Sequence, residues 1–300
     1  MNIRGERLQN MIFDWIQYAV LLSFIRFINI FPFKISVQVL RGMGLLLYLF
    51  DSRHRKTALS NLRASFPEKH DTEITGVAKD VFKNIGSIVA EMARVLKDGN
   101  KWLEKAVIYE GMENLTGAIK KGNGALIMTG HIGNWEIGAL AGKDYKLNFV
   151  VRTLDNRFLN KIIYKIRTTF NSGVIEKKNA VREILRCLKR NELVAILMDQ
   201  NTSRDEGVFV DFFGRKACTT PVIATLAMRT GAPVLPIFAI REGTGKIKII
   251  VGEAIEVIPS GDYQEDIERY TAVFTGIIES VIRKYPDQWL WLHRRWKTKP

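Results

Sequence analysis

Between residues 124 and 286, short apolar runs that suit buried β-strands alternate with longer segments of helical periodicity. The strand-like runs are GALIMTG (124–130), LNFVVR (147–152), LVAILMD (193–199), PVLPIFAIRE (233–242) and KIKIIVGEAIEV (246–257). The segments between them repeat apolar residues every three to four positions, as does the stretch 55–98. This alternation predicts an α/β fold in which helices flank a mixed sheet.

The N-terminus is a long apolar stretch, in which only Asp14 and Arg26 are charged between Met11 and Phe33. Crossing a bilayer takes ~20 residues, so this stretch is long enough. Two alternatives are a signal peptide, although no small-residue cleavage site follows, and a buried core helix, which Arg26 and Asn29 would suit.

We expect a hydrophobic membrane-anchoring helix in residues 1–34, which spans the bilayer or lies in its interface, and one catalytic domain in residues 35–300. A second apolar run, MGLLLYLF (43–50), is too short to span alone. The C-terminal WLWLHRRW (289–296) mixes indoles and cations, which suits a membrane interface.

The chain carries 45 Lys and Arg against 31 Asp and Glu, a formal charge of +14, which indicates an anionic partner. No helix-turn-helix, zinc or ribonucleoprotein signature is present, so we expect no nucleic-acid partner. The two cysteines have no metal-type spacing, and the four histidines are scattered. We therefore expect no metal, no cofactor and no thiol nucleophile.

His131 and Glu136 follow the first strand-like run, within TGHIGNWE. The carboxyl end of a strand is where α/β folds place their sites. A histidine in such a turn can act as a general base, and a nearby carboxylate can stabilise its imidazolium. A capping or core histidine with a surface glutamate is the alternative for an isolated pair of this spacing.

Seven blocks, in order along the chain, resemble the bacterial lipid A biosynthesis acyltransferases, the late acyltransferases of lipopolysaccharide assembly within the lysophospholipid acyltransferase superfamily. The blocks are NLRASFPE (61–68), GHIGNWE (130–136), VVRTLDN (150–156), MDQN (198–201), GVFVDFFG (207–214), TPVIATLAMRTGAPVLPIF (220–238) and YPDQWLWLHRRWK (285–297). Asp211 stands where the family usually has proline.

The resemblance implies a glycerolipid-acyltransferase-like fold and transfer of a fatty acyl chain from acyl carrier protein to a hydroxyl of a lipid A precursor of the Kdo-lipid IVA type. It places the enzyme in the inner membrane, with the catalytic domain on the cytoplasmic face. The acidic carrier protein, the glycolipid acceptor and anionic inner-membrane lipids would all suit a basic chain.

The resemblance also implies roles for single residues. His131 becomes the general base and Glu136 its partner, in a direct transfer without an acyl-enzyme. Substrate contacts are expected from Arg152, Arg167, Asp199, Gln200 and Asn134. Arg167, or backbone amides near Gly133, would stabilise the oxyanion.

Two other hypotheses remain open at this point. The acceptor could be another glycolipid or a phosphatidylinositol mannoside, with acyl-CoA as donor. The chain could instead be a non-catalytic, basic, membrane-peripheral lipid-binding protein. The sequence does not determine the acyl chain length, the acceptor hydroxyl or the oligomeric state.

Overall fold

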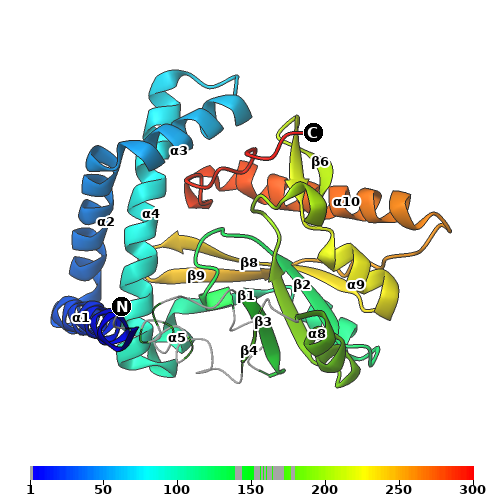
Figure 1. The fold of residues 1–300 in the computed structure, drawn as a ribbon, viewed down its shortest axis with the longest axis horizontal. Coiled ribbons are helices and arrows are strands. Elements are labelled where there is room, and N and C mark those ends of the chain that lie inside the picture. The colour runs from blue at the N-terminus through cyan, green and yellow to red at the C-terminus, as the bar shows by residue number, and fades with distance from the viewer. Residues whose placement is uncertain are drawn as a thin grey trace.

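The structure is a computed structural model that describes residues 3–138, 144–151, 156, 158, 160, 164, 172–176 and 180–300. In this part of the chain, seven strands form one sheet in the order β1-β9-β8-β2-β5-β3-β4 (Figure 1). The strands are β1 (Val107–Glu110), β2 (Ala125–Thr129), β3 (Leu147–Val151), β4 (Gly173–Glu176), β5 (Leu193–Leu197), β8 (Val234–Gly243) and β9 (Lys246–Val251). Neighbours are parallel except β8 and β9, which confirms the predicted mixed sheet.

Both faces of the sheet are covered, because alternate side chains of the central strands are apolar on each side. Leu126 and Met128 of β2 join one core cluster, and Ala125 and Ile127 join the other. The first cluster includes residues of α3 (Ser52–Ser65), α4 (Asp71–Asp98), α8 (Ala180–Lys189), α9 (Val222–Thr230) and α10 (Tyr263–Lys284). The second includes residues of α5 (Asn100–Ala106) and α6 (Met112–Ile119).

Two apolar helices precede this domain, α1 (Ile3–Ile28) and α2 (Phe33–Phe50). Met11–Ile28 and Phe33–Phe50 are each long and apolar enough to cross a membrane. The run 43–50 is therefore the end of an 18-residue helix, longer than the sequence indicated. The predicted boundary at residue 34 falls in the first turn of α2.

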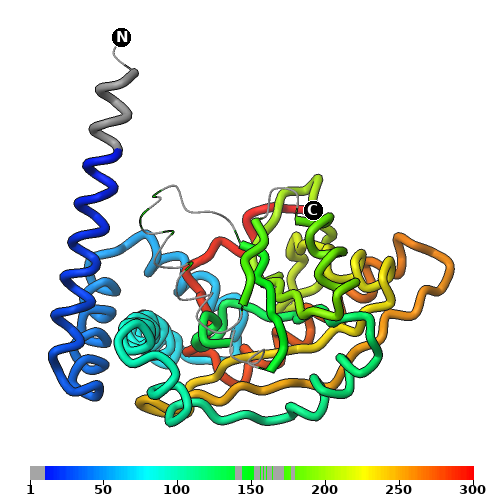
Figure 2. Tube along the Cα trace, turned by 90° about the horizontal axis from the view of Figure 1, so that it is seen from below, coloured from blue at the N-terminus to red at the C-terminus, as the bar shows by residue number. Residues whose placement is uncertain are grey.

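Helix α2 packs lengthwise against α4 (Figures 1 and 2). Helix α1 crosses the direction of α4 at the edge of the molecule. The α2–α4 contact is close because each helix contributes a glycine. A Cβ on Gly44 would lie 2.2 Å from the carbonyl oxygen of Phe82, and one on Gly86 would lie 2.1 Å from that of Leu40.

The C-terminal segment corrects one prediction. Trp289, Trp291 and Arg295 are almost completely buried, so WLWLHRRW is part of the core and not a membrane interface. The reason is a long-range partner, the hairpin of β6 (Val208–Phe212) and β7 (Arg215–Thr219). The Phe212 ring contacts Trp289 edge-on with 5.6 Å between ring centroids, and Arg295 donates 2.7 Å to the carbonyl oxygen of Cys218.

Candidate active site

Two neighbouring parallel strands bring His131 and Asp199 together. Gly130 and His131 follow β2, whereas Met198 and Asp199 follow β5, and the register pairs Thr129 with Leu197. The Asp199 carboxylate accepts from the ring Nδ1 of His131 at 2.8 Å and from its backbone amide at 2.8 Å. The predicted strand-end position of both residues is confirmed, and the structure adds the direct contact between them.

The indole of Trp289 fixes the other side of this carboxylate. Its Nε1 donates to Asp199 Oδ2 at 2.7 Å. The backbone of Trp289 forms an isolated antiparallel β-bridge with Ile132. Next to it, the amide of Leu290 donates a hydrogen bond of 3.1 Å to the carbonyl oxygen of His131. Trp289 was not predicted as a site residue, since no local pattern ties the C-terminal block to residue 131.

The Asp199 carboxylate stays charged although its side chain is only 1% exposed. Burial by itself would raise the pKa of Asp199, but the charge of His131 and hydrogen bonds from the His131 ring, Trp289 and the His131 amide lower it to about 2. A charged Asp199 favours a proton on Nδ1 of His131, which leaves a lone pair on Nε2.

The Nε2 side of His131 carries the chemistry of the site. The His131 side chain is 21% exposed, so this nitrogen can meet a substrate. Gln200 lies 3.4 Å away through its amide nitrogen, a long contact that a substrate hydroxyl can replace. The indole of Trp135 contacts the His131 ring edge-on, with 5.1 Å between the ring centroids.

The loop after His131 is held by its own backbone. The amides of Ile132, Gly133 and Asn134 donate to the carbonyls of Gly130, Gln288 and Ala239, at 2.8, 2.9 and 2.9 Å. These three amides are therefore occupied inside the protein. Oxyanion stabilisation by other amides near Gly133 stays a prediction.

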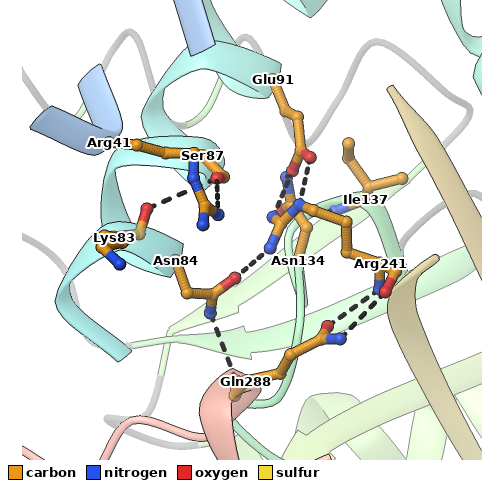
Figure 3. A network of polar contacts seen from close by, with 9 residues as sticks. All are labelled: Arg41, Lys83, Asn84, Ser87, Glu91, Asn134, Ile137, Arg241 and Gln288. Atoms are coloured by element: carbon orange, nitrogen blue, oxygen red, sulfur yellow. Dashed lines mark hydrogen bonds and ion pairs between the residues drawn. The ribbon is translucent and has the colours of Figure 1, made fainter. Parts of the chain in front are cut away.

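A buried polar network lies behind this loop (Figure 3). Arg241 of β8 binds Glu91 of α4 through two nitrogens, at 2.5 and 2.6 Å, and both side chains are at most 9% exposed. Asn134 donates 2.8 Å to the same carboxylate, and Asn84 bonds to Arg241. Gln288 binds the backbone of Arg241 twice, at 2.9 Å each.

This network explains the position of Asn134. Its side chain is fully buried, donates to Glu91 and accepts from the amide of Ile137 at 3.3 Å. In this structure Asn134 therefore fixes the loop, and a substrate contact of its side chain stays a prediction. Glu136 is half-buried in the following turn. Its role as partner of His131 also stays a prediction.

Two predicted site residues, Arg152 and Arg167, lie outside the described residues. So does most of residues 156–170, one of the segments of helical periodicity between the strand-like runs. Cys187 and Cys218 are buried, and burial raises the pKa of the Cys187 thiol to about 11, which makes it a poor nucleophile at neutral pH. Among the described residues, no group of three His, Cys, Asp or Glu side chains is placed to hold a metal ion.

Comparison with known proteins assigns the chain to a family. A family model for the bacterial lipid A biosynthesis acyltransferases matches residues 5–298. The Lipid A biosynthesis palmitoleoyltransferase of Escherichia coli is 26% identical over 90% of this chain and 87% of that protein. The Lipid A biosynthesis lauroyltransferase of Escherichia coli shows the same identity and coverage. The chain belongs to the bacterial lipid A biosynthesis acyltransferase family and is an acyltransferase.

The chain also aligns with a solved structure, the 1-acyl-sn-glycerophosphate acyltransferase PlsC from Thermotoga maritima. The TM-score is 0.38 and the identity 18%, over 84% of this chain and 97% of that one. The family assignment rests on the sequence matches.

Proposed function

We propose that this enzyme transfers a fatty acyl group from acyl carrier protein to a hydroxyl of a lipid A precursor of the Kdo-lipid IVA type, with His131 as general base. The observation that carries the proposal is the His131–Asp199 pair. Asp199 holds Nδ1, and Nε2 of the partly exposed His131 side chain is left to take a proton.

The reaction follows from this geometry. His131 Nε2 takes the proton of the acceptor hydroxyl while its oxygen attacks the thioester carbonyl carbon. The carbonyl oxygen becomes an oxyanion, and the tetrahedral intermediate then collapses. The C–S bond breaks, and the thiolate takes the proton from the imidazolium. The products are an ester and the free thiol of the carrier, so no acyl-enzyme and no cofactor are needed.

Charged groups of both signs complete the proposed mechanism. The negative charge of Asp199 stabilises the imidazolium, and Glu136, in the turn after His131, would add to it. The loop amides 132–134 already have partners inside the protein, so we propose that a cation stabilises the oxyanion, supplied by Arg167 or Arg152. General-base help of this kind contributes roughly 10²–10⁴-fold to the rate.

The N-terminal helices support a membrane location. Exposed apolar side chains form a stripe on α2, which includes Val39, Met43, Leu47 and Phe50. The described part of α1 is also mostly exposed, with Phe13, Trp15 and Val20 among its exposed side chains. We infer that both helices contact lipid, with the catalytic domain on the cytoplasmic face of the inner membrane, where the acidic acyl carrier protein would meet a basic chain.

Expression in a lipopolysaccharide-producing host without late acyltransferases tests the acceptor class. Mass spectrometry of the extracted lipid A should show one additional acyl group with the wild-type chain and none with His131→Ala. Immunoblots of membrane fractions control for equal amounts of the two proteins. A lipid A mass that stays unchanged with abundant wild-type protein would contradict the proposal.

A further inference from the structure

A cavity of about 350 Å³ opens between the N-terminal part of α3, the segment after β5 and the C-terminal segment. Its polar lining residues include Arg53 and Thr57 of α3, Asn201 after β5, and His293, Arg294 and Lys297 near the C-terminus. Among the described residues, no carboxylate lines it. The cavity is therefore a basic concavity built from three separate parts of the chain.

Three of its cations carry no counter-charge. Arg53, Arg294 and Lys297 have no carboxylate within 4.0 Å in the part of the chain that the structure describes, and all three are exposed. His54, in the same wall, differs because its Nδ1 lies 2.6 Å from Asp51. Three unpaired cations that line one hollow attract an anion more strongly than scattered surface cations do.

Hydrogen bonds join the segments that line the cavity. Asn61 of α3 donates 2.9 Å to the carbonyls of both Trp291 and His293, which fastens α3 to the C-terminal segment. The Asn201 side chain donates 3.0 Å to Thr298 Oγ1 and accepts from the Thr298 amide at 3.1 Å. The hollow is thus held open by buried or half-buried hydrogen bonds and does not depend on the cations themselves.

The cavity also lies close to the catalytic pair. Asn201 stands two residues after Asp199 on the same strand end. His293, on the other wall, follows Leu290, whose amide binds the carbonyl of His131. Burial lowers the pKa of His293, the charge of Asp199 raises it and that of His131 lowers it. The side of the cavity that carries His293 is therefore close enough to the catalytic pair to feel its charges.

We propose that this cavity is a phosphate subsite, in which Arg53, Arg294 and Lys297 hold a phosphate group of one substrate while its reacting atoms lie at His131. Guanidinium groups match phosphate oxygens in pairs, and a lysine adds a point charge. The proposal rests on the proposed function for the identity of the substrates. Two of them carry phosphate: the glycolipid acceptor, and the phosphopantetheine arm that holds the thioester.

The variants are Arg53→Gln, Arg294→Gln and Lys297→Gln, singly and as a triple variant of the full chain in detergent. The three side chains are exposed and unpaired, so the fold should survive their exchange. Arg229→Gln is the matched control. Arg229 is also exposed and without a carboxylate partner in the described structure, but it lies on α9, which ends beside the loop that precedes β2, at the opposite end of the parallel strands.

The first measurement is binding of inorganic phosphate, followed as the shift of the melting temperature at constant ionic strength with chloride as reference. Wild type and Arg229→Gln should be stabilised by phosphate, and the triple variant should lose the shift. This measurement needs no turnover, so it stands whether or not acyl transfer occurs. Equal shifts in the triple variant and in wild type would overturn the proposal.

The second measurement assigns the phosphate. Initial rates are taken against acyl carrier protein thioester, and against acceptors with and without each of their phosphates. Each cation removed should raise the KM of one substrate roughly tenfold, with little change in kcat. If the phosphate belongs to the acceptor, the acceptor KM rises and the effect disappears with the dephosphorylated acceptor. If it belongs to the donor arm, the donor KM rises with every acceptor.

The two hypotheses can fail separately. No transfer by the wild type with any acceptor would contradict the proposed function and leave the phosphate-binding result unaffected. Transfer by the triple variant with wild-type KM for both substrates, and a wild-type melting shift, would overturn the phosphate subsite alone.

Discussion

At the scale of single residues, Asp199 decides what His131 can do. Three donors converge on its carboxylate: the ring of His131, the backbone amide of His131 and the indole of Trp289. Each donor favours the charged form, and together they outweigh the cost of burial. The charge of Asp199 then fixes the orientation of the His131 ring and keeps its proton on Nδ1. Without this contact the ring could rotate and carry its proton on either nitrogen.

This coupling predicts an acid-dependent part of the stability. The pKa of Asp199 is about 2 in the folded chain, below its ordinary value of 3.8. As the pH falls below 4, the unfolded chain therefore binds the proton first. The stabilisation is complete above about pH 4 and is lost as the pH falls through 2, an effect of ~2 kcal/mol.

Chemical denaturation of wild type and Asp199→Asn, from pH 6 down to pH 2, measures this effect. The stability difference between them should shrink by that amount as the pH falls. Asp205→Asn, an exposed aspartate in the short helix η2 (Arg204–Glu206), should show no such change. A wild-type advantage that stays constant over the whole range would contradict the coupling.

At the scale of elements, the turn after β2 depends on Gly133. Its φ is +60°, and a Cβ there would lie 2.0 Å from the carbonyl oxygen of Ala239. Gly133→Ala should therefore destabilise the chain by about 1–3 kcal/mol and displace His131, with a large loss of activity. Urea unfolding and initial rates measure the two effects.

Gly76 offers the opposite case as a control. It lies inside α4, exposed, with nothing within 4 Å of an added Cβ. Gly76→Ala should stabilise the chain by about 0.5–1 kcal/mol, because alanine favours a helix interior. If Gly133→Ala were as well tolerated as Gly76→Ala, the close approach to β8 would not hold the loop.

The Glu91–Arg241 pair joins α4, β8 and the catalytic loop (Figure 3). Glu91→Gln leaves the buried Arg241 guanidinium without its counter-charge, which should cost about 3–5 kcal/mol. Adding Arg241→Met should recover part of the loss, and a double-mutant cycle measures the coupling. Glu256→Gln, in an exposed pair with Lys121, should leave stability unchanged. Additive effects of the two core substitutions would contradict a coupled network.

At the scale of the whole molecule, α2 presents apolar side chains outward on the side away from α4. Met43, Leu47 and Phe50 are 42%, 53% and 82% exposed, so their replacement by serine should leave the core intact. The triple variant should bind anionic vesicles roughly tenfold more weakly in flotation assays. Val273→Ser, an equally apolar exposed site on α10, should bind like wild type. Unchanged binding of the triple variant would contradict lipid contact by α2.

The sequence was informative where local pattern decides structure. The five strand-like runs were all strands, because a short apolar run is a local property of the sequence. The strand-end position pointed to a site at His131, and the family resemblance added Asp199 to it. The strands β1, β4, β6 and β7 were missed: β1 and β4 have only four residues each, and β6 and β7 pair with each other outside the main sheet.

Contacts between residues distant along the chain account for the features that the sequence did not predict. WLWLHRRW has the composition of an interfacial belt, yet contacts with Phe212 and Cys218 bury it. The Trp289–Asp199 hydrogen bond depends on the same packing, so no spacing rule predicts it. The amides of Gly133 and Asn134 likewise donate to tertiary partners, Gln288 and Ala239, which are distant along the chain.

The most direct test of the account is acyl transfer by the purified full chain in detergent. The reaction contains acyl carrier proteins loaded with C10 to C18 chains and tetra-acylated Kdo-lipid IVA, and mass spectrometry reads the product. Wild type, His131→Ala and Arg229→Gln are compared at equal concentration. The account predicts one acyl-sized mass gain with wild type and Arg229→Gln, and a rate lower by roughly 10²–10⁴-fold with His131→Ala. A wild-type rate in His131→Ala would contradict it.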